Sequence, residues 1–350
     1  MTVRSAEVSG LHTEVIAVPE RLGCAVIGLG MMGERHARIW AELPQTELVS
    51  VVDLIPERSQ ALAARLGVEA AASWQELVTD PRVQIVSVCT DDQSHRDPCV
   101  AAAEAGKHIL VEKPLATSLE DADAILQAAD KAGVKLMVGH VVRFDPRYAV
   151  AKQAMEDGEI GEVIQVFARR NNIVASGRRI APRTSVAYFL GVHDIDIIRW
   201  LVGSEIVRVH AESASKVLAD VGAEDSIFTL MKFANGAVGC LETCWVIPEG
   251  VPNTLDARLE IVGTKGRVAV RVGDESLDVA SSDRARRPDI AYGPVMLGQQ
   301  HGALRTQLEH FAACVLQDED PLVSNADARA AVAVADAIHR SLASGQPVTL

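Results

Sequence analysis

Short apolar runs alternate with helix-forming stretches between residues 22 and about 140. Each run is continuous rather than interrupted by polar residues, which is typical of strands covered on both faces. The alanine-rich segments between the runs contain few helix breakers and predict crossover helices. The pattern therefore predicts one α/β domain, residues 22–140, with a doubly wound parallel sheet. Its strands are expected at 24–27, 48–52, 85–89, 108–111 and 134–138, and its helices at 34–42, 57–66, 96–105 and 119–132.

The pattern changes beyond residue 140. Strand-like stretches now follow one another in hairpin order, with turn sequences at Asn235-Gly236 and Thr264-Lys265-Gly266. Residues 141–350 are expected to form an α+β domain with an open, mostly antiparallel sheet and a long loop at about 274–301, and residues 1–21 an N-terminal tail. The expected strands are 163–169, 206–213, 226–233, 237–245 and 255–262, and the expected helices are 192–202, 304–316 and 326–341.

Charge narrows the range of partners. The 350 residues include 34 lysines and arginines against 47 aspartates and glutamates, a formal net charge of −13. This balance disfavours nucleic acid and anionic membranes as partners. No apolar run is long enough for a membrane helix and acidic residues interrupt the first 20 positions, so we expect a cytoplasmic protein. Six scattered cysteines without a C-x-x-C pair favour reduced thiols and predict no metal site.

The clearest motif is Gly28-Leu29-Gly30-Met31-Met32-Gly33, which directly follows a predicted strand and opens a helix. In that context the glycines allow a tight turn and the close approach of a pyrophosphate, and the helix N-terminus offers free N–H groups. Asp53 ends the next strand, where a carboxylate binds the adenosine ribose hydroxyls and repels a 2′-phosphate. The motif predicts NAD rather than NADP as cofactor. A helix cap before Pro56 is the alternative, and compatible, role of Asp53.

With the second domain added, the chain resembles the Gfo/Idh/MocA family of oxidoreductases from about residue 22 to the C-terminus. Besides the glycine turn and Asp53, the resemblance rests on residues 105–114, 139–146, 191–201 and 260–266. It implies an N-terminal Rossmann domain and a second domain whose open sheet often mediates a homodimer or homotetramer. It also implies oxidation of a secondary hydroxyl, or reduction of the ketone, on a small sugar, cyclitol or derivative.

The resemblance assigns two catalytic residues. Lys113, in Glu112-Lys113-Pro114 at a strand end, matches the family's catalytic lysine, whose ammonium positions the reacting oxygen and stabilises its charge. His193 matches the family's acid/base histidine, and its ordinary pKa suits proton exchange near neutral pH. If this segment is helical, Asp196 lies on the same face and is placed to orient the His193 ring. A histidine buried for structural reasons is the alternative.

The segment 90–95 resembles the family loop that lines the nicotinamide side. Thr90 and His95 are therefore expected to contact the cofactor together with Glu112, although His95 equally fits the start of the next helix. The resemblance further implies a cis peptide before Pro114.

Position 189 departs from the family pattern. Family dehydrogenases usually carry an aspartate four residues before the histidine, where this chain has Phe189. Phenylalanine accepts no strong hydrogen bond, so Tyr188, Asp194 or a distant residue replaces the aspartate, or the substrate differs. Stacking on a sugar face and filling of the core are further uses of the ring.

Five arginines form a second unusual feature, because no acidic residue stands between Glu162 and Asp194. Such a stretch favours a carboxylate or phosphate site if it faces Lys113, and a solvated loop or oligomer contact otherwise. The arginines are Arg169, Arg170, Arg178, Arg179 and Arg183. Substrate contacts are expected from Arg143, Arg170, Phe189 and Asp196.

The leading hypothesis is an NAD-dependent dehydrogenase acting on a CH–OH group of a sugar or cyclitol. A redox-neutral glycosidase or lyase that keeps NAD bound would show the same motifs, and Phe189 favours it. A non-catalytic dinucleotide-sensing regulator is the third reading, and the presence of both Lys113 and His193 argues against it.

Overall fold

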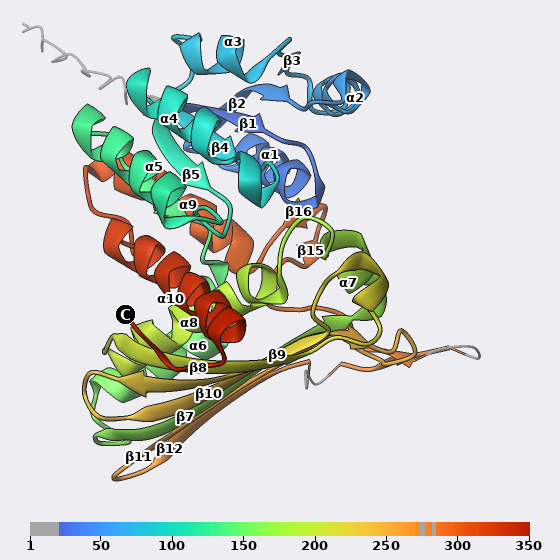
Figure 1. Ribbon diagram of the computed structural model, residues 1–350. Helices are drawn as coiled ribbons and strands as arrows, with labels where there is room; N and C mark the ends of the chain where they lie inside the picture. Colours follow the sequence, from blue (N-terminus) through green and yellow to red (C-terminus); the bar gives the residue numbers. More distant parts are fainter. Residues whose placement is uncertain (1–20, 274–276, 282–284) are drawn as a thin grey trace, which may run out of the picture.

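The computed structural model describes residues 21–350 apart from 274–276 and 282–284 (Figure 1). Nearly all of the expected N-terminal tail lies outside the described residues, as does part of the expected long loop. The described chain contains a six-stranded sheet and a seven-stranded sheet, with helices packed around and between them. Within the described ranges, no helix is long and apolar enough to span a membrane.

The six-stranded sheet is parallel, in the order β3-β2-β1-β4-β5-β6, which confirms the predicted doubly wound fold. Strand order reverses between β1 and β4, and ligands of such sheets bind at the carboxyl ends of the strands at this point. The strands are β1 Leu22–Ile27, β2 Thr46–Val52, β3 Glu69–Ala70, β4 Ile85–Val88, β5 His108–Val111 and β6 Leu136–Val138. The connecting helices are α1 Met31–Glu42, α2 Pro56–Leu66, α3 Trp74–Thr79, α4 Arg96–Glu104 and α5 Leu119–Ala132.

The seven-stranded sheet has the order β12-β11-β7-β10-β9-β8-β17, and only β7 and β10 pair in parallel, so the mostly antiparallel sheet is confirmed. Helix α6 was not predicted; it begins at Pro146 with an Asp145 cap. The strands are β7 Val163–Ile173, β8 Ile206–Ala214, β9 Ser226–Phe233, β10 Val238–Ile247, β11 Leu255–Gly263, β12 Arg267–Val272 and β17 Val348–Thr349. The helices are α6 Pro146–Glu156, α7 Val174–Ile180, α8 Val192–Val202, α9 Ala303–Gln317 and α10 Asn325–Ser344.

Side chains alternate across the seven-stranded sheet. In β9, Ile227 and Met231 are buried, whereas Phe228 and Leu230 between them are 51% and 59% exposed. Figure 1 shows α8 and α10 between this sheet and the six-stranded sheet. The exposed apolar residues lie on the other face, because successive side chains of a strand point to opposite faces. The homodimer or homotetramer stays a prediction.

The expected long loop contains more structure than its sequence indicated. Two short antiparallel strand pairs form within it, β13 Val279–Ala280 with β14 Ala285–Arg286, and β15 Val295–Met296 with β16 Gln299–Gln300, the second of them a hairpin. The second hairpin region packs on α1, since Gln300 N–H donates to Glu42 (3.1 Å) and the Tyr292 hydroxyl donates to Met32 Sδ (3.4 Å). Through Tyr292, this segment of the second domain thus contacts Met32 in the glycine turn.

Candidate active site

The glycine turn after β1 has the shape that a dinucleotide pyrophosphate needs. Gly28 has a φ of +86°, and a Cβ there would lie 2.6 Å from the Cys89 carbonyl oxygen. A Cβ at Gly33 would overlap the Gly28 carbonyl oxygen. Helix α1 can therefore pack closely on the turn only because residue 33 is a glycine. Beside Gly30 no atom lies within 4 Å of a Cβ position, and α1 begins there without a side-chain cap. The turn therefore leaves space and free N–H groups for an anion.

Asp53 follows β2 and faces this turn. Its Oδ2 accepts a hydrogen bond from Leu29 N–H (2.6 Å), and its Oδ1 accepts one from Ile55 N–H (2.9 Å). The carboxylate thus holds the glycine turn and the loop before α2. It does not cap the helix, because α2 begins after Ile55 without a side-chain cap, so the expected capping role is wrong. Because a carboxylate offers about four acceptor positions, ribose hydroxyls can bind the same group.

Asp53→Ala is expected to weaken NADH binding by about 10- to 100-fold, the equivalent of one or two lost hydrogen bonds to a charged group. Affinity for NADPH should fall less, because the variant also loses the charge that repels a 2′-phosphate. Fluorescence titration with both nucleotides measures this, with Glu57→Ala, exposed in the first turn of α2, as the control. Equal losses for the two nucleotides would show that Asp53 only supports the turn.

Lys113 follows β5 and joins the two halves of the molecule. Its Nζ donates to the Phe189 carbonyl oxygen (3.0 Å) and lies 4.2 Å from the centre of the Phe189 ring. The Lys113–Pro114 peptide is cis, which confirms the expectation from the resemblance. Burial lowers the pKa of Lys113, while the Glu112 and Asp92 carboxylates oppose this shift. Phe189 therefore holds the lysine through its backbone and its ring, with no carboxylate at that position.

His193 is the second residue of α8, which directly follows a π-helical turn at Ala187–Gly191. Its Nδ1 is buried and has no hydrogen-bond partner among the described residues. Burial, followed by the charges of Lys113 and Arg170, holds the pKa of His193 well below its usual value. The ring is therefore neutral near neutral pH and free to accept a proton, but it is a weaker base than an ordinary histidine, which corrects the expectation of an unshifted pKa.

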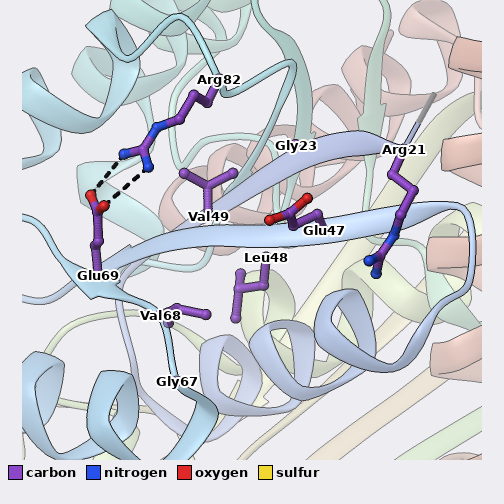
Figure 2. Close-up of a pocket in the computed structure, with 9 residues that line it drawn as sticks. All are labelled: Arg21, Gly23, Glu47, Leu48, Val49, Gly67, Val68, Glu69 and Arg82. Carbon is purple, nitrogen blue, oxygen red and sulfur yellow. Dashed lines mark hydrogen bonds and ion pairs between the residues drawn. The ribbon is translucent and has the colours of Figure 1, made fainter.

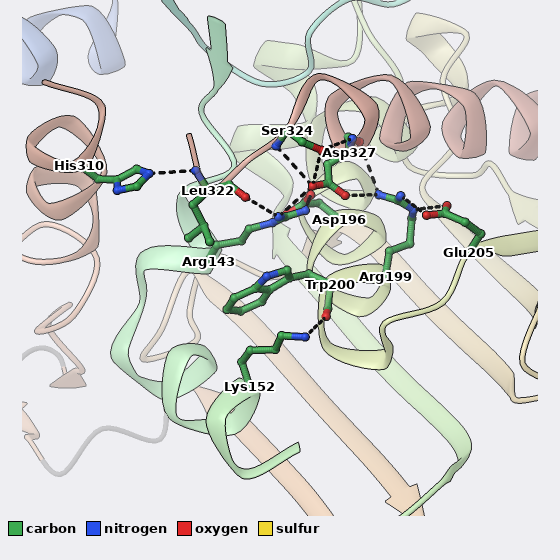
Figure 3. Close-up of polar contacts among 10 residues, drawn as sticks. All are labelled: Arg143, Lys152, Asp196, Arg199, Trp200, Glu205, His310, Leu322, Ser324 and Asp327. Atoms are coloured by element: carbon green, nitrogen blue, oxygen red, sulfur yellow. Dashed lines mark hydrogen bonds and ion pairs between the residues drawn. The ribbon is translucent and has the colours of Figure 1, made fainter. Parts of the chain in front are cut away.

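Asp196 does not orient His193, so that prediction is wrong. Both of its oxygens are bound by Arg143, from Nε (2.8 Å) and from Nη2 (2.6 Å), as Figure 3 shows. Arg143 Nη1 reaches the Leu322 carbonyl oxygen (3.1 Å) and Asp327 (3.2 Å). The Arg143 side chain is 1% exposed and that of Asp196 is fully buried. The pair joins the segment after β6 to α8 and α10, and this burial corrects the expectation that both residues contact substrate.

Four of the five arginines in the acid-free stretch are already paired with carboxylates, and the fifth, Arg179, is exposed on α7. Arg170 Nε donates to Asp194 Oδ2 (2.5 Å), and the fork of the guanidinium is occupied by this buried carboxylate. Burial raises the pKa of Asp194 and Arg170 opposes the rise. Three more of the arginines find carboxylates outside the stretch: Arg169 with Glu242 and Asp256, Arg178 with Asp220, and Arg183 with Asp91. Arg170 still lies close enough to Lys113 and His193 to affect the pKa of both.

The loop after β4 is fastened beside Lys113. His95 Nδ1 lies 2.9 Å from the Pro114 carbonyl oxygen and His95 Nε2 lies 3.3 Å from that of Thr90. Gln93 reaches across to the Arg183 carbonyl oxygen (2.6 Å). Burial lowers the pKa of His95. His95 both braces this loop and precedes α4, so the two expectations for it are compatible, and its contact with NAD stays a prediction, like those of Thr90 and Glu112.

Two residues near Lys113 received no individual role from the sequence. Asp92 is 9% exposed and its Oδ2 is buried without a hydrogen-bond partner among the described residues. His140 is 1% exposed, and neither of its ring nitrogens has a hydrogen-bond partner among the described residues. Each follows a strand adjacent to β5 at its carboxyl end, β4 for Asp92 and β6 for His140. Their position at strand ends was the available signal.

A cavity of about 380 Å³ is lined by Gln93, Thr117 and Tyr188, sequence neighbours of the residues around Lys113, but Lys113 and His193 themselves do not line it. A larger cavity, about 430 Å³, lies at the amino ends of β1 and β2, far along these strands from the glycine turn (Figure 2). Ligands of such sheets bind at the carboxyl ends of the strands, so this cavity lies outside the candidate active site. An exposed ion pair between Arg82 and Glu69 (2.7 Å) lines it. Among the described residues no group of three or more His, Cys, Asp or Glu side chains is placed to hold a metal ion.

Comparison with known proteins agrees with this geometry. Residues 22–140 match a family model described as an oxidoreductase family with an NAD-binding Rossmann fold, and residues 152–350 match the model of its C-terminal alpha/beta domain. The scyllo-inositol 2-dehydrogenase (NAD(+)) of Bacillus subtilis is 33% identical over 93% of this chain and 96% of its own. The myo-inositol 2-dehydrogenase of Thermotoga maritima is 30% identical over 93% and 97%. The crystal structure of GenD2 from gentamicin A biosynthesis, in complex with NAD, superposes with a TM-score of 0.80 at 26% identity, covering 97% of this chain and 99% of that one.

Proposed function

Because the chain belongs to the Gfo/Idh/MocA family of oxidoreductases, we propose that it transfers hydride between NAD and a secondary ring hydroxyl of a cyclitol or a related sugar. The nearness of Lys113 and His193 supports this proposal. Lys113 follows β5 at the carboxyl end of the parallel sheet, its Nζ reaches the carbonyl oxygen of Phe189 four residues before His193, and its charge acts on the neutral His193 ring. The inositol dehydrogenases among the relatives support a cyclitol as substrate.

Bound NAD would supply the hydride acceptor, and the turn that contains Gly30, together with Asp53, would hold it. The Lys113 ammonium donates a hydrogen bond to the substrate hydroxyl oxygen and stabilises its negative charge as the C–H bond breaks. The neutral His193 ring accepts the hydroxyl proton. Its Nδ1 is enclosed by protein, which leaves Nε2 to face the substrate.

The test is NADH absorbance with purified protein, NAD and a panel of inositols, neutral aldoses, sugar acids and glycosides, with product masses read in parallel. NADH formation with an inositol or a neutral sugar is the expected result. Preference for a sugar acid is not expected, because Arg170 is already paired with Asp194. Conversion of no substrate in either direction would contradict the proposal.

Phe189 favours a second candidate function, that of a redox-neutral enzyme that keeps NAD bound. Phe189 stands where family dehydrogenases usually carry an aspartate. Lys113 Nζ is held at this position by the Phe189 backbone carbonyl instead of a carboxylate. Among the relatives, the 2,7-anhydro-N-acetylneuraminate hydratase of Mediterraneibacter gnavus is 26% identical over 91% of this chain. Cleaved or hydrated product without net NADH in the same assay would support this candidate over the dehydrogenase.

A further inference from the structure

A line of buried polar side chains runs through the first domain to the backbone of Lys113. Trp40 Nε1 donates to Ser87 Oγ (2.8 Å), and this oxygen lies 3.3 Å from His36 Nδ1. His36 Nε2 lies 3.2 Å from Glu112 Oε1, and Glu112 Oε2 accepts a hydrogen bond from Lys113 N–H (3.2 Å). Trp40, His36 and Ser87 are fully buried. The line therefore connects the core of the domain to the lysine of the proposed active site.

The two ends of this line have fixed roles, because an indole only donates and a carboxylate only accepts. Ser87 Oγ accepts from Trp40 Nε1, and its hydroxyl can donate to or accept from His36 Nδ1. The other ring nitrogen, His36 Nε2, faces Glu112 Oε1 at ion-pair distance, without the angles of an ordinary hydrogen bond. His36 therefore brings a ring nitrogen against a carboxylate that is 8% exposed.

Glu112 and Lys113 depend on each other electrostatically. Burial alone would raise the pKa of Glu112, but His36 and Lys113 outweigh burial and the pKa lies below its usual value. Burial lowers the pKa of Lys113, and Glu112 is the group that opposes this most. The charged or titratable groups that face Lys113 from the surrounding elements are Glu112, Asp92, Arg170, Arg183, His140 and His193.

We propose that His36, acting through Glu112, is a positioning residue that keeps Lys113 protonated in the active site. His36 favours the ionised form of Glu112, and the ionised carboxylate favours the ammonium form of Lys113. The catalytic meaning of this inference rests on the proposed function. Its physical content, the charge of Lys113, is measurable without NAD or substrate.

The experiment follows reductive methylation of Lys113 against pH, by peptide mass spectrometry on the full chain without ligands. Glu112→Gln is expected to lower the midpoint by about one pH unit, so that Lys113 reacts about tenfold faster at a fixed pH below it. His36→Phe keeps a ring without nitrogens and is expected to shift the midpoint in the same direction. The matched control is His108→Phe at the opposite end of β5, which should leave the midpoint unchanged.

The double variant His36→Phe/Glu112→Gln separates this role from a structural one. It should shift the midpoint no further than Glu112→Gln alone, because His36 acts only through the glutamate. Additive shifts, or an unchanged midpoint in folded Glu112→Gln, would overturn the proposal. Ser87→Ala tests the same line with a smaller change if His36→Phe does not fold, and an unchanged midpoint there would also count against it.

The methylation midpoint of Lys113 and the oxidation of a substrate are independent measurements, so either result can be negative without the other. If a polyol is oxidised, the alkaline limb of kcat/KM should move to lower pH in Glu112→Gln by the same amount as the methylation midpoint. Shifted methylation midpoints in a protein that oxidises none of the substrates would sustain the role of His36 and refute the dehydrogenase.

Discussion

Replacement of Lys113 by methionine should lower kcat for the cyclitol or sugar substrate by about 10²- to 10³-fold, the cost of losing a charged donor aimed at a developing oxyanion. Methionine keeps an unbranched apolar stem beside the Phe189 ring, so the contact between the domains is largely preserved. The glycine turn and Asp53 lie on other strand ends, so NADH affinity should not change. Steady-state kinetics and a fluorescence titration of NADH measure the two quantities.

The comparison variant is Lys131→Met, an exposed lysine in the last turn of α5, which should leave kcat unaltered. A fall in kcat with equally weakened NADH binding would place Lys113 in cofactor binding instead. Activity equal to the parent protein would remove Lys113 from the mechanism, and with it the reason for the hydride-transfer proposal.

Features that depend on local sequence were predicted well. The glycine turn is specified within six residues, because a tight turn, an open approach and close helix packing each need a missing side chain at a fixed spacing. Lys113 was singled out by the family resemblance, and the structure places it after the buried strand β5, as expected. Helix α8 at Val192–Val202 has the predicted bounds. Strand β3 and helix α3 were not predicted, because two and six residues are too few to show a periodic pattern of apolar positions.

Features that depend on distant partners were missed. The i+3 spacing placed Asp196 near His193, but its stronger partner, Arg143, lies 53 positions away and reaches it only in the folded chain. In the same way, a stretch without acids suggested free arginines, yet Asp194 and more distant carboxylates pair with four of the five. A buried guanidinium must find an anion, and sequence spacing does not show which one.

Removal of the Arg143 guanidinium should cost more stability than any surface change in the second domain. Arg143→Met leaves Asp196 as an unpaired charge with a fully buried side chain, and we expect the free energy of unfolding to fall by about 3–5 kcal/mol. Arg340→Met is the matched control, because Arg340 is 55% exposed in its ion pair with Asp336 on α10. That change should cost no more than about 1 kcal/mol.

The double variant Arg143→Met/Asp196→Leu tests whether the loss comes from the stranded charge or from packing. With methionine and leucine in place of the pair, Asp196 no longer leaves a buried charge unpaired, so the double variant should be more stable than Arg143→Met alone. Urea unfolding monitored by circular dichroism gives all three free energies. A double variant less stable than both single variants would mean that the pair acts mainly by joining the segment after β6 to α10 through Leu322 and Asp327, contacts that Arg143 makes besides Asp196.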